Sequence, residues 1–124
     1  MKTDKEILDE FGKILIEDVY DHTQSSLQKY MDGIFTKPED TSEFIRTLSD
    51  DKKKYLKQYI QSSSVTTLFD FLKIFEEHKE FKLVYEENGT QVNLEKISEM
   101  LKAEILSKVG WIARFSKHIE NDDK

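Results

Sequence analysis

Cysteine is absent from the 124 residues, and the chain has one proline and four glycines. Without cysteine the chain has no disulfide, zinc ribbon, iron–sulfur cluster or cysteine nucleophile of its own. So little glycine and proline argues against collagen, a disordered linker or a loop-rich sandwich. Unbroken apolar runs reach only two or three residues, as at 14–16, so we expect no membrane-spanning segment.

Basic residues are outnumbered, 19 against 25 acidic residues, which gives a formal net charge of −6. The only lysine cluster, Lys52 to Lys54 with Lys57, directly follows Asp50 and Asp51. We therefore expect no general binding to nucleic acid, which needs clustered positive charge. The charged N-terminal segment is not typical of a signal peptide, so a cytoplasmic protein is the expectation.

Known catalytic and nucleotide-binding motifs are also missing. There is no Walker A loop, G-x-G-x-x-G, G-x-S-x-G elbow or H-E-x-x-H helix. The sequence therefore predicts no catalytic residue and no cofactor.

Apolar residues at steps of three and four predict an amphipathic helix over about 4–32. They are Ile7, Leu8, Phe11, Ile14, Leu15, Val19, Leu27, Tyr30 and Met31, with Thr23 between them. Thr3 or Asp4 is the expected N-cap, and Gly33 stands where a C-terminal cap would lie.

Two further helical segments are expected before residue 80. A short one carries Phe44, Ile45 and Leu48 after a cap at Thr41 or Ser42. The next begins after Ser49, where a hydroxyl and two carboxylates favour a helix N-terminus, and it runs to about residue 78. The serine run at 62–64 leaves open one kinked helix or two abutting helices.

A β-hairpin is expected at about 81–94, because the apolar spacing there changes to alternation. Asn88-Gly89 is a strong signal for a two-residue turn, since both residues need positive φ. This turn places Tyr85 opposite Val92 and Leu83 opposite Leu94, so all four share one face.

A fourth helix, capped by Asn93, is expected to carry Leu94, Ile97, Leu101 and Ile105 and to end near Gly110. A last helical stripe follows with Trp111, Ile112, Phe115 and Ile119, and Trp111 is expected to anchor the core. The predicted fold class is mostly α (α+β): a single domain over 1–124, a bundle-like set of helices with one hairpin.

One cluster has the chemistry of a metal site. Glu17 and Asp21, and likewise Asp18 and His22, are four residues apart and share a helix face. Asp18, Asp21 and His22, completed by Glu104 from another helix, would give oxygen and nitrogen ligands for a divalent ion. This cluster is the basis of the alternative function, a metal-dependent enzyme or small-molecule binder. We favour the interpretation that these residues form a solvated acidic helix face, so no metal is expected.

Acidic side chains crowd the outer faces of the first helix. Residues 4–21 hold seven carboxylates against two lysines. A basic protein partner is one reason for a chain to tolerate this repulsion, and solubility is the other. Asp9, Glu10 and Glu17 are the expected partner-binding residues.

The C-terminal stretch reads Gly110-Trp111-Ile112-Ala113-Arg114-Phe115-Ser116-Lys117. It resembles a small bacterial family of unknown function whose members close with Gly-Trp-Ile, two residues, and Phe-Ser. Asp21 matches an Asp within the first helix of that family, whereas Phe69 and Met100 replace an expected histidine and glycine. The resemblance implies a bacterial source and no mechanism.

The favoured function is a small acidic, non-catalytic protein-binding or regulatory domain. An immunity- or antitoxin-type role, in which the acidic domain masks a basic enzyme surface, is one version of it.

Overall fold

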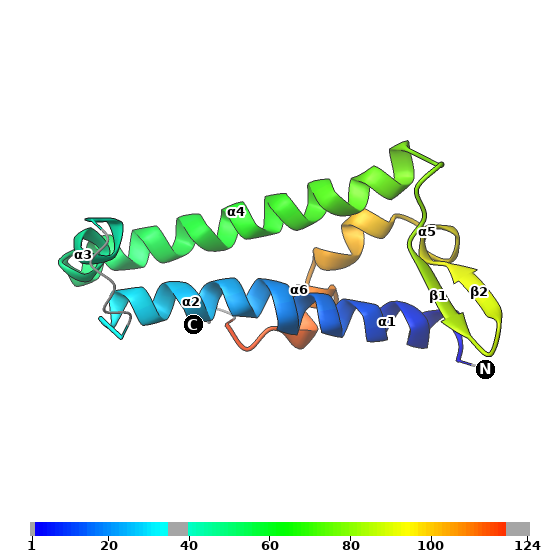
Figure 1. Cartoon of the computed structure of the whole chain (residues 1–124), viewed down its shortest axis with the longest axis horizontal. Helices are drawn as coiled ribbons and strands as arrows, with labels where there is room; N and C mark the ends of the chain where they lie inside the picture. Colours follow the sequence, from blue (N-terminus) through cyan, green and yellow to red (C-terminus); the bar gives the residue numbers. More distant parts are fainter. Residues whose placement is uncertain (1, 35–39, 119–124) are drawn as a thin grey trace.

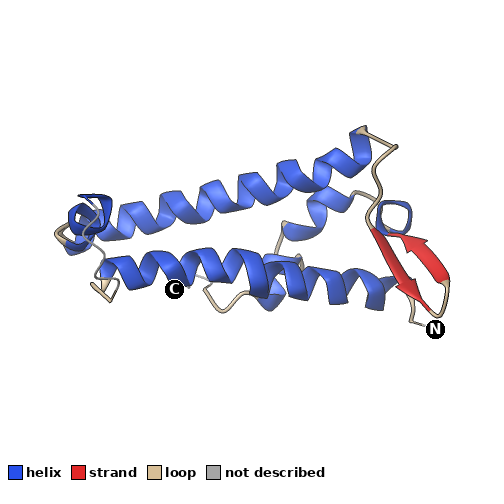
Figure 2. Cartoon of the chain, in the orientation of Figure 1, coloured by secondary structure: helices blue, strands red, loops and turns tan. Residues whose placement is uncertain are grey.

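The computed structural model describes residues 2–34 and 40–118, and this part of the chain is mostly helical with an antiparallel hairpin at one end (Figures 1 and 2). The predicted fold class is confirmed. The elements are α1 (Asp4–Leu15), the π-helical turn η1 (Ile16–Tyr20), α2 (Asp21–Met31), α3 (Asp40–Arg46), α4 (Asp50–Glu77), β1 (Val84–Glu87), β2 (Thr90–Asn93), α5 (Leu94–Ile97), the 3-10 helix η2 (Leu101–Ile105) and α6 (Trp111–Phe115).

Two long helical rods dominate the molecule (Figure 1). The first consists of α1, η1 and α2, and the second is α4. Lys53 Nζ donates to the carbonyl of Met31, and Gln24 Nε2 donates to Ser64 Oγ at 3.1 Å. The rods are therefore antiparallel, and Figure 1 shows them diverging towards the hairpin.

The first rod begins and ends as its sequence predicts. Thr3 and Glu6 form a capping box, in which each side chain accepts a hydrogen bond from the backbone N–H of the other residue. Gly33 has φ +73°, and the N–H of Ile34 donates to the carbonyl of Lys29. This is the Schellman arrangement, which a glycine at this position allows.

The π-helical turn in the middle of the rod changes which residues face the core. The N–H of Asp21 reaches back five residues to the carbonyl of Ile16. The extra residue in this turn shifts the helix phase. Ile16 and Tyr20 are buried, whereas Ile14 and Val19 are exposed. The expectation that Ile14 and Val19 belong to the core stripe was wrong; the phase shift accounts for Val19, whereas Ile14 precedes the turn, on α1.

Helix α4 is continuous through its serines, which settles the open question about 62–64. Ser49 Oγ accepts from the N–H of Lys52 as the expected cap. Ser64 Oγ donates to the carbonyl of Ile60 and accepts from Gln24, so this serine marks tight contact with α2. Helix α3 begins at Asp40, which places Thr41 and Ser42 inside the helix rather than at its cap.

The hairpin has the predicted turn and register. Asn88 and Gly89 both have positive φ, and Tyr85 pairs with Val92. The N–H of Leu94 donates to the carbonyl of Leu83 at 2.9 Å, which extends the pairing beyond the strands.

The expected fourth helix is instead two short pieces. Asn93 caps α5 as predicted, but Met100 is extended, with φ −154° and ψ 97°, and separates α5 from η2. Leu101 and Ile105 thereby reach the core from a 3-10 helix that packs on α4. Gly110 precedes α6 and does not end a helix; Trp111 is fully buried, and Ile119 lies outside the described residues.

Candidate functional site

Residues 101–118, which we call the C-terminal segment, cover one side of the two rods. Arg114 Nη2 lies 2.8 Å from Asp9 Oδ1, and the Trp111 ring lies directly against Gly12. Lys102 of η2 pairs with Glu76 of α4 at 3.5 Å. These contacts fix the segment against α1 and α4 together.

Asp21 belongs to this contact and is turned inward. Its carboxylate accepts from Ser116 Oγ at 2.6 Å and from the N–H of Lys117 at 2.9 Å. Only 7% of the residue is exposed. Asp21 thus holds the chain after α6, which is a structural reason for an aspartate in the middle of the helix.

The other members of the acidic cluster are elsewhere. Asp18 and His22 are exposed, and Glu104 accepts a hydrogen bond from Ser98 Oγ at 2.6 Å. Within residues 2–34 and 40–118, no three histidine or acidic side chains are placed to hold a metal ion. The geometry therefore gives no support to the metal-dependent alternative.

The expected partner-binding carboxylates have three different environments. Asp9 bonds to Arg114 and to Lys5, and the hydrogen bond from Arg114 lowers the pKa of Asp9 to about 2. Glu10 is exposed and lies 3.0 Å from Lys2 Nζ. Glu17 is half-buried. The expectation that all three are exposed holds only for Glu10, because Asp9 serves an internal contact.

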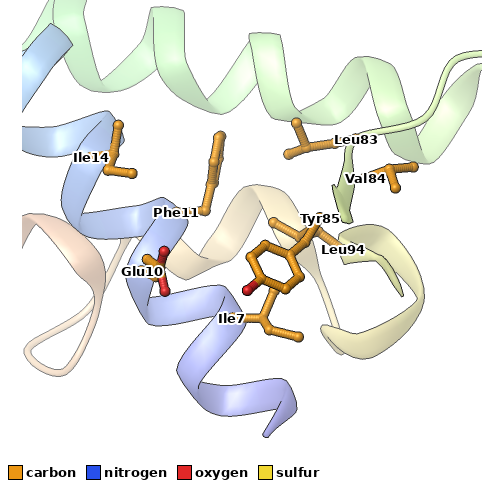
Figure 3. A pocket seen from close by; sticks show the side chains of 8 residues that line it. All are labelled: Ile7, Glu10, Phe11, Ile14, Leu83, Val84, Tyr85 and Leu94. Atoms are coloured by element: carbon orange, nitrogen blue, oxygen red, sulfur yellow. The ribbon is translucent and has the colours of Figure 1, made fainter. Parts of the chain in front are cut away.

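The opposite side of the rods is open. Near the hairpin, a hollow of about 120 Å³ lies between α1 and the β1 segment (Figure 3). Its walls are almost wholly apolar, and they are formed by Ile7, Glu10, Phe11, Ile14, Leu83, Val84, Tyr85 and Leu94. At the edge of this hollow, Lys2 donates a hydrogen bond to the Tyr85 hydroxyl. This hydrogen bond raises the pKa of Lys2, and the hydrogen bond to Glu10 adds a smaller effect in the same direction.

A second hollow, of about 250 Å³, lies between the rods, where η1 and the start of α2 face α4. It is lined by Val19, Tyr20, Thr23, Ile60, Ser63, Ser64, Thr67 and Leu68. Each hollow is smaller than the roughly 300–1,000 Å³ typical of small-molecule sites. Their small volumes argue against an enclosed small-molecule ligand in either of them.

Exposed apolar side chains lie on the helix faces beside the two hollows. On α4, Thr67, Phe71 and Ile74 follow one another at steps of four and three, so they share a helix face. On the first rod, Ile14 and Val19 lie beside the hollows. The exposed fractions are Ile14 52%, Val19 46%, Phe71 44%, Ile74 41% and Val84 39%. We call the surface that consists of the two hollows and these exposed side chains the open groove.

Carboxylates border the open groove on both rods. Glu10 stands four residues before Ile14 and shares its face of α1, and Asp18 lies in η1 directly before Val19. Asp70 and Glu77 follow Ser63 at intervals of seven residues on α4. We call Glu10, Asp18, Asp70 and Glu77 the acidic rim; all four are exposed.

Sequence reasoning missed most of this surface. It assigned Ile14 and Val19 to the core, and it gave Arg114 and Ser116 no partners. Apolar spacing alone carries no sign of a π-helical turn, and the partners of Arg114 and Ser116 are 105 and 95 residues away. A usable signal was the surplus of apolar residues on α4, where Phe71 and Ile74 lie beside the stripe formed by Leu68, Leu72 and Phe75.

Comparison with protein-family models, curated proteins and solved structures finds no match for this chain. In the described ranges, no helix combines the length and apolar character needed to cross a membrane.

Proposed function

We propose that the chain is a non-catalytic protein-binding domain and that the open groove is its docking surface. The observation that carries this proposal is the pair of hollows together with the exposed apolar side chains on the helix faces beside them. Exposed apolar surface rimmed by polar groups is typical of interaction sites.

The arrangement of the rest of the core supports the same function. The C-terminal segment supplies Leu101, Ile105 and Trp111 to one side of the rods, where they are buried. The side with the open groove has no such cover in the described part of the chain. A partner that occupied the groove would bury Ile14, Val19, Phe71 and Ile74. The immunity- or antitoxin-type role remains a prediction within this class.

Photo-crosslinking in cells of the native organism tests the proposal. A p-benzoylphenylalanine at position 71 places the reactive group in the open groove, where Phe71 is already an exposed aromatic residue. The same group at position 109 is the matched control, because Val109 is 75% exposed and lies outside the groove. We expect a covalent adduct with a second protein at position 71 and none at position 109.

A blocking variant makes the test specific. Ile14→Asn together with Val19→Asn places polar groups across the groove from position 71, and it should abolish the adduct while the far-UV circular dichroism spectrum stays unchanged. Adducts of equal yield at positions 71 and 109, or no adduct at either, would refute a docking role for the groove.

A further inference from the structure

We infer that the occupant of the open groove is a single amphipathic helix of another protein whose polar flanks are basic. This inference rests on the proposed function and adds the chemistry of the partner. It is carried by the shape of the groove and by the charge of its rim.

The groove has the form of a site for a third helix. It lies between two antiparallel helical rods, and a helix laid there would pack against both, as in a helical bundle. Its α4 wall runs from Ile60 to Ile74, about 21 Å at the helical rise of 1.5 Å per residue. A partner helix of about four turns matches this length.

The acidic rim specifies the flanks of that helix. Glu10 and Asp18 border the groove on one rod, and Asp70 and Glu77 border it on the other. Lys2 contacts Glu10 at 3.0 Å and Lys73 lies 3.9 Å from Glu77, whereas Asp18 and Asp70 make no ion pair in the described part of the chain. Lysine or arginine on both flanks of the partner helix would complement these carboxylates.

A second copy of this chain fits the groove less well. Two copies would each bring a net charge of −6, and each would bring the same acidic rim to the contact. Like charges placed opposite one another disfavour association. A basic partner is therefore the occupant that the charge distribution selects.

Three labelled synthetic peptides of 18 residues test the inference by fluorescence anisotropy. The first has leucine at positions i, i+3, i+4 and i+7 and lysine elsewhere; the second has glutamate in place of lysine; the third is a scrambled version of the first without helical periodicity. In about 0.05 M salt we expect the Leu/Lys helix to bind at least about tenfold more tightly than either other peptide. The difference from the Leu/Glu helix should shrink in about 0.5 M salt, where charges are screened.

Charge reversal at the rim is the decisive variant. Asp18→Lys with Asp70→Lys should reverse the preference and favour the Leu/Glu helix. Glu43→Lys with Glu99→Lys is the matched control, because it changes the net charge equally at exposed positions away from the groove. This control should keep the preference for the Leu/Lys helix.

The outcomes separate the inference from the proposed function. Equal binding of the Leu/Lys and Leu/Glu helices, abolished by Ile14→Asn with Val19→Asn, overturns the basic flanks and leaves the groove as a docking site. Equal binding of the scrambled peptide overturns the helical occupant. Binding of none of the three overturns the inference as a whole, and the photo-crosslinking result then decides the proposed function by itself. A dimer in sedimentation that the Ile14→Asn and Val19→Asn variant dissociates would identify a second copy as the occupant and also overturn the inference.

Discussion

Replacement of Gly12 by alanine tests the closest contact between the first rod and the C-terminal segment. A Cβ atom on Gly12 would lie 2.4 Å from the ring of Trp111, well inside van der Waals contact. The ring is fully buried and stands edge-on against Phe11, with ring centroids 5.9 Å apart. Any movement of the ring therefore displaces other core side chains.

The expected loss follows from two opposing effects. Overpacking of a dense core costs about 1–3 kcal/mol. Because the Trp111 ring is rigid and close, we expect a cost of about 3 kcal/mol for the added Cβ atom. Alanine is a better helix former than glycine by about 1 kcal/mol. We therefore expect Gly12→Ala to lower the free energy of unfolding by about 2 kcal/mol.

Urea denaturation followed by far-UV circular dichroism measures this free energy. The control is the same substitution in a Trp111→Leu background, where the smaller side chain leaves room for the Cβ atom. The loss caused by Gly12→Ala should shrink or change sign there, because the two positions are coupled. An unchanged or increased stability of Gly12→Ala in the natural background would refute the close packing of Gly12 on Trp111.

Four other predictions follow from the site. Asp9→Asn should lower the free energy of unfolding by about 1 kcal/mol at neutral pH, after allowance for partial exposure. Because Arg114 lowers the pKa of Asp9 to about 2, this loss should vanish as the pH falls from about 4 through 2. A pH-independent loss in urea titrations would contradict this expectation. Asp21→Ala should cost about 1–3 kcal/mol, since it leaves the part-buried donors of Ser116 and Lys117 without their acceptor. Asp21→Asn should cost less, and equal losses by chemical denaturation would argue against these bonds. EDTA should leave the melting temperature unchanged in calorimetry, and a fall of several degrees would indicate a bound metal. Gel-shift assays at physiological salt should show no retention of duplex DNA or RNA, and a steep salt-dependent shift at micromolar protein would contradict this.

Features decided by neighbouring residues could be predicted from the sequence. The caps at Thr3, Ser49 and Asn93 depend on a side chain and the N–H groups two or three residues ahead. The hairpin depends on Asn88-Gly89 and on alternation in the strands beside it. Each signal lies within a few residues, so the periodicity and the turn chemistry agree.

Features decided by distant contacts could not. The π-helical turn lets Ile16 and Tyr20 both reach the core, and nothing in the local sequence distinguishes it from an ordinary helix. The break at Met100 interrupts a sequence with acceptable helical spacing, because Leu101 and Ile105 reach the core from a 3-10 helix. The open groove depends on the π-helical turn and on the break at Met100. It is the surface of the rods that stays uncovered when the C-terminal segment packs on their other side.

The acidic residues of the first rod show why composition alone gave an ambiguous docking site. As a group they are an unexplained excess of negative charge, but the structure divides them by role. Asp9 and Asp21 hold the C-terminal segment, and Glu6 completes a cap, where the hydrogen bonds with Thr3 lower its pKa. Glu10 and Asp18 remain at the groove.

This division changes which variants can test a basic partner. Reversing Asp9, Glu10 and Glu17 together would break the contact between Asp9 and Arg114, so a loss of binding could come from a displaced C-terminal segment. The side chains of Asp18 and Asp70 form no hydrogen bond or ion pair in the described part of the chain, and both residues are exposed. Reversal of these two changes the charge at the groove while leaving the known internal contacts in place, so its effect on association reports on the partner rather than on the fold.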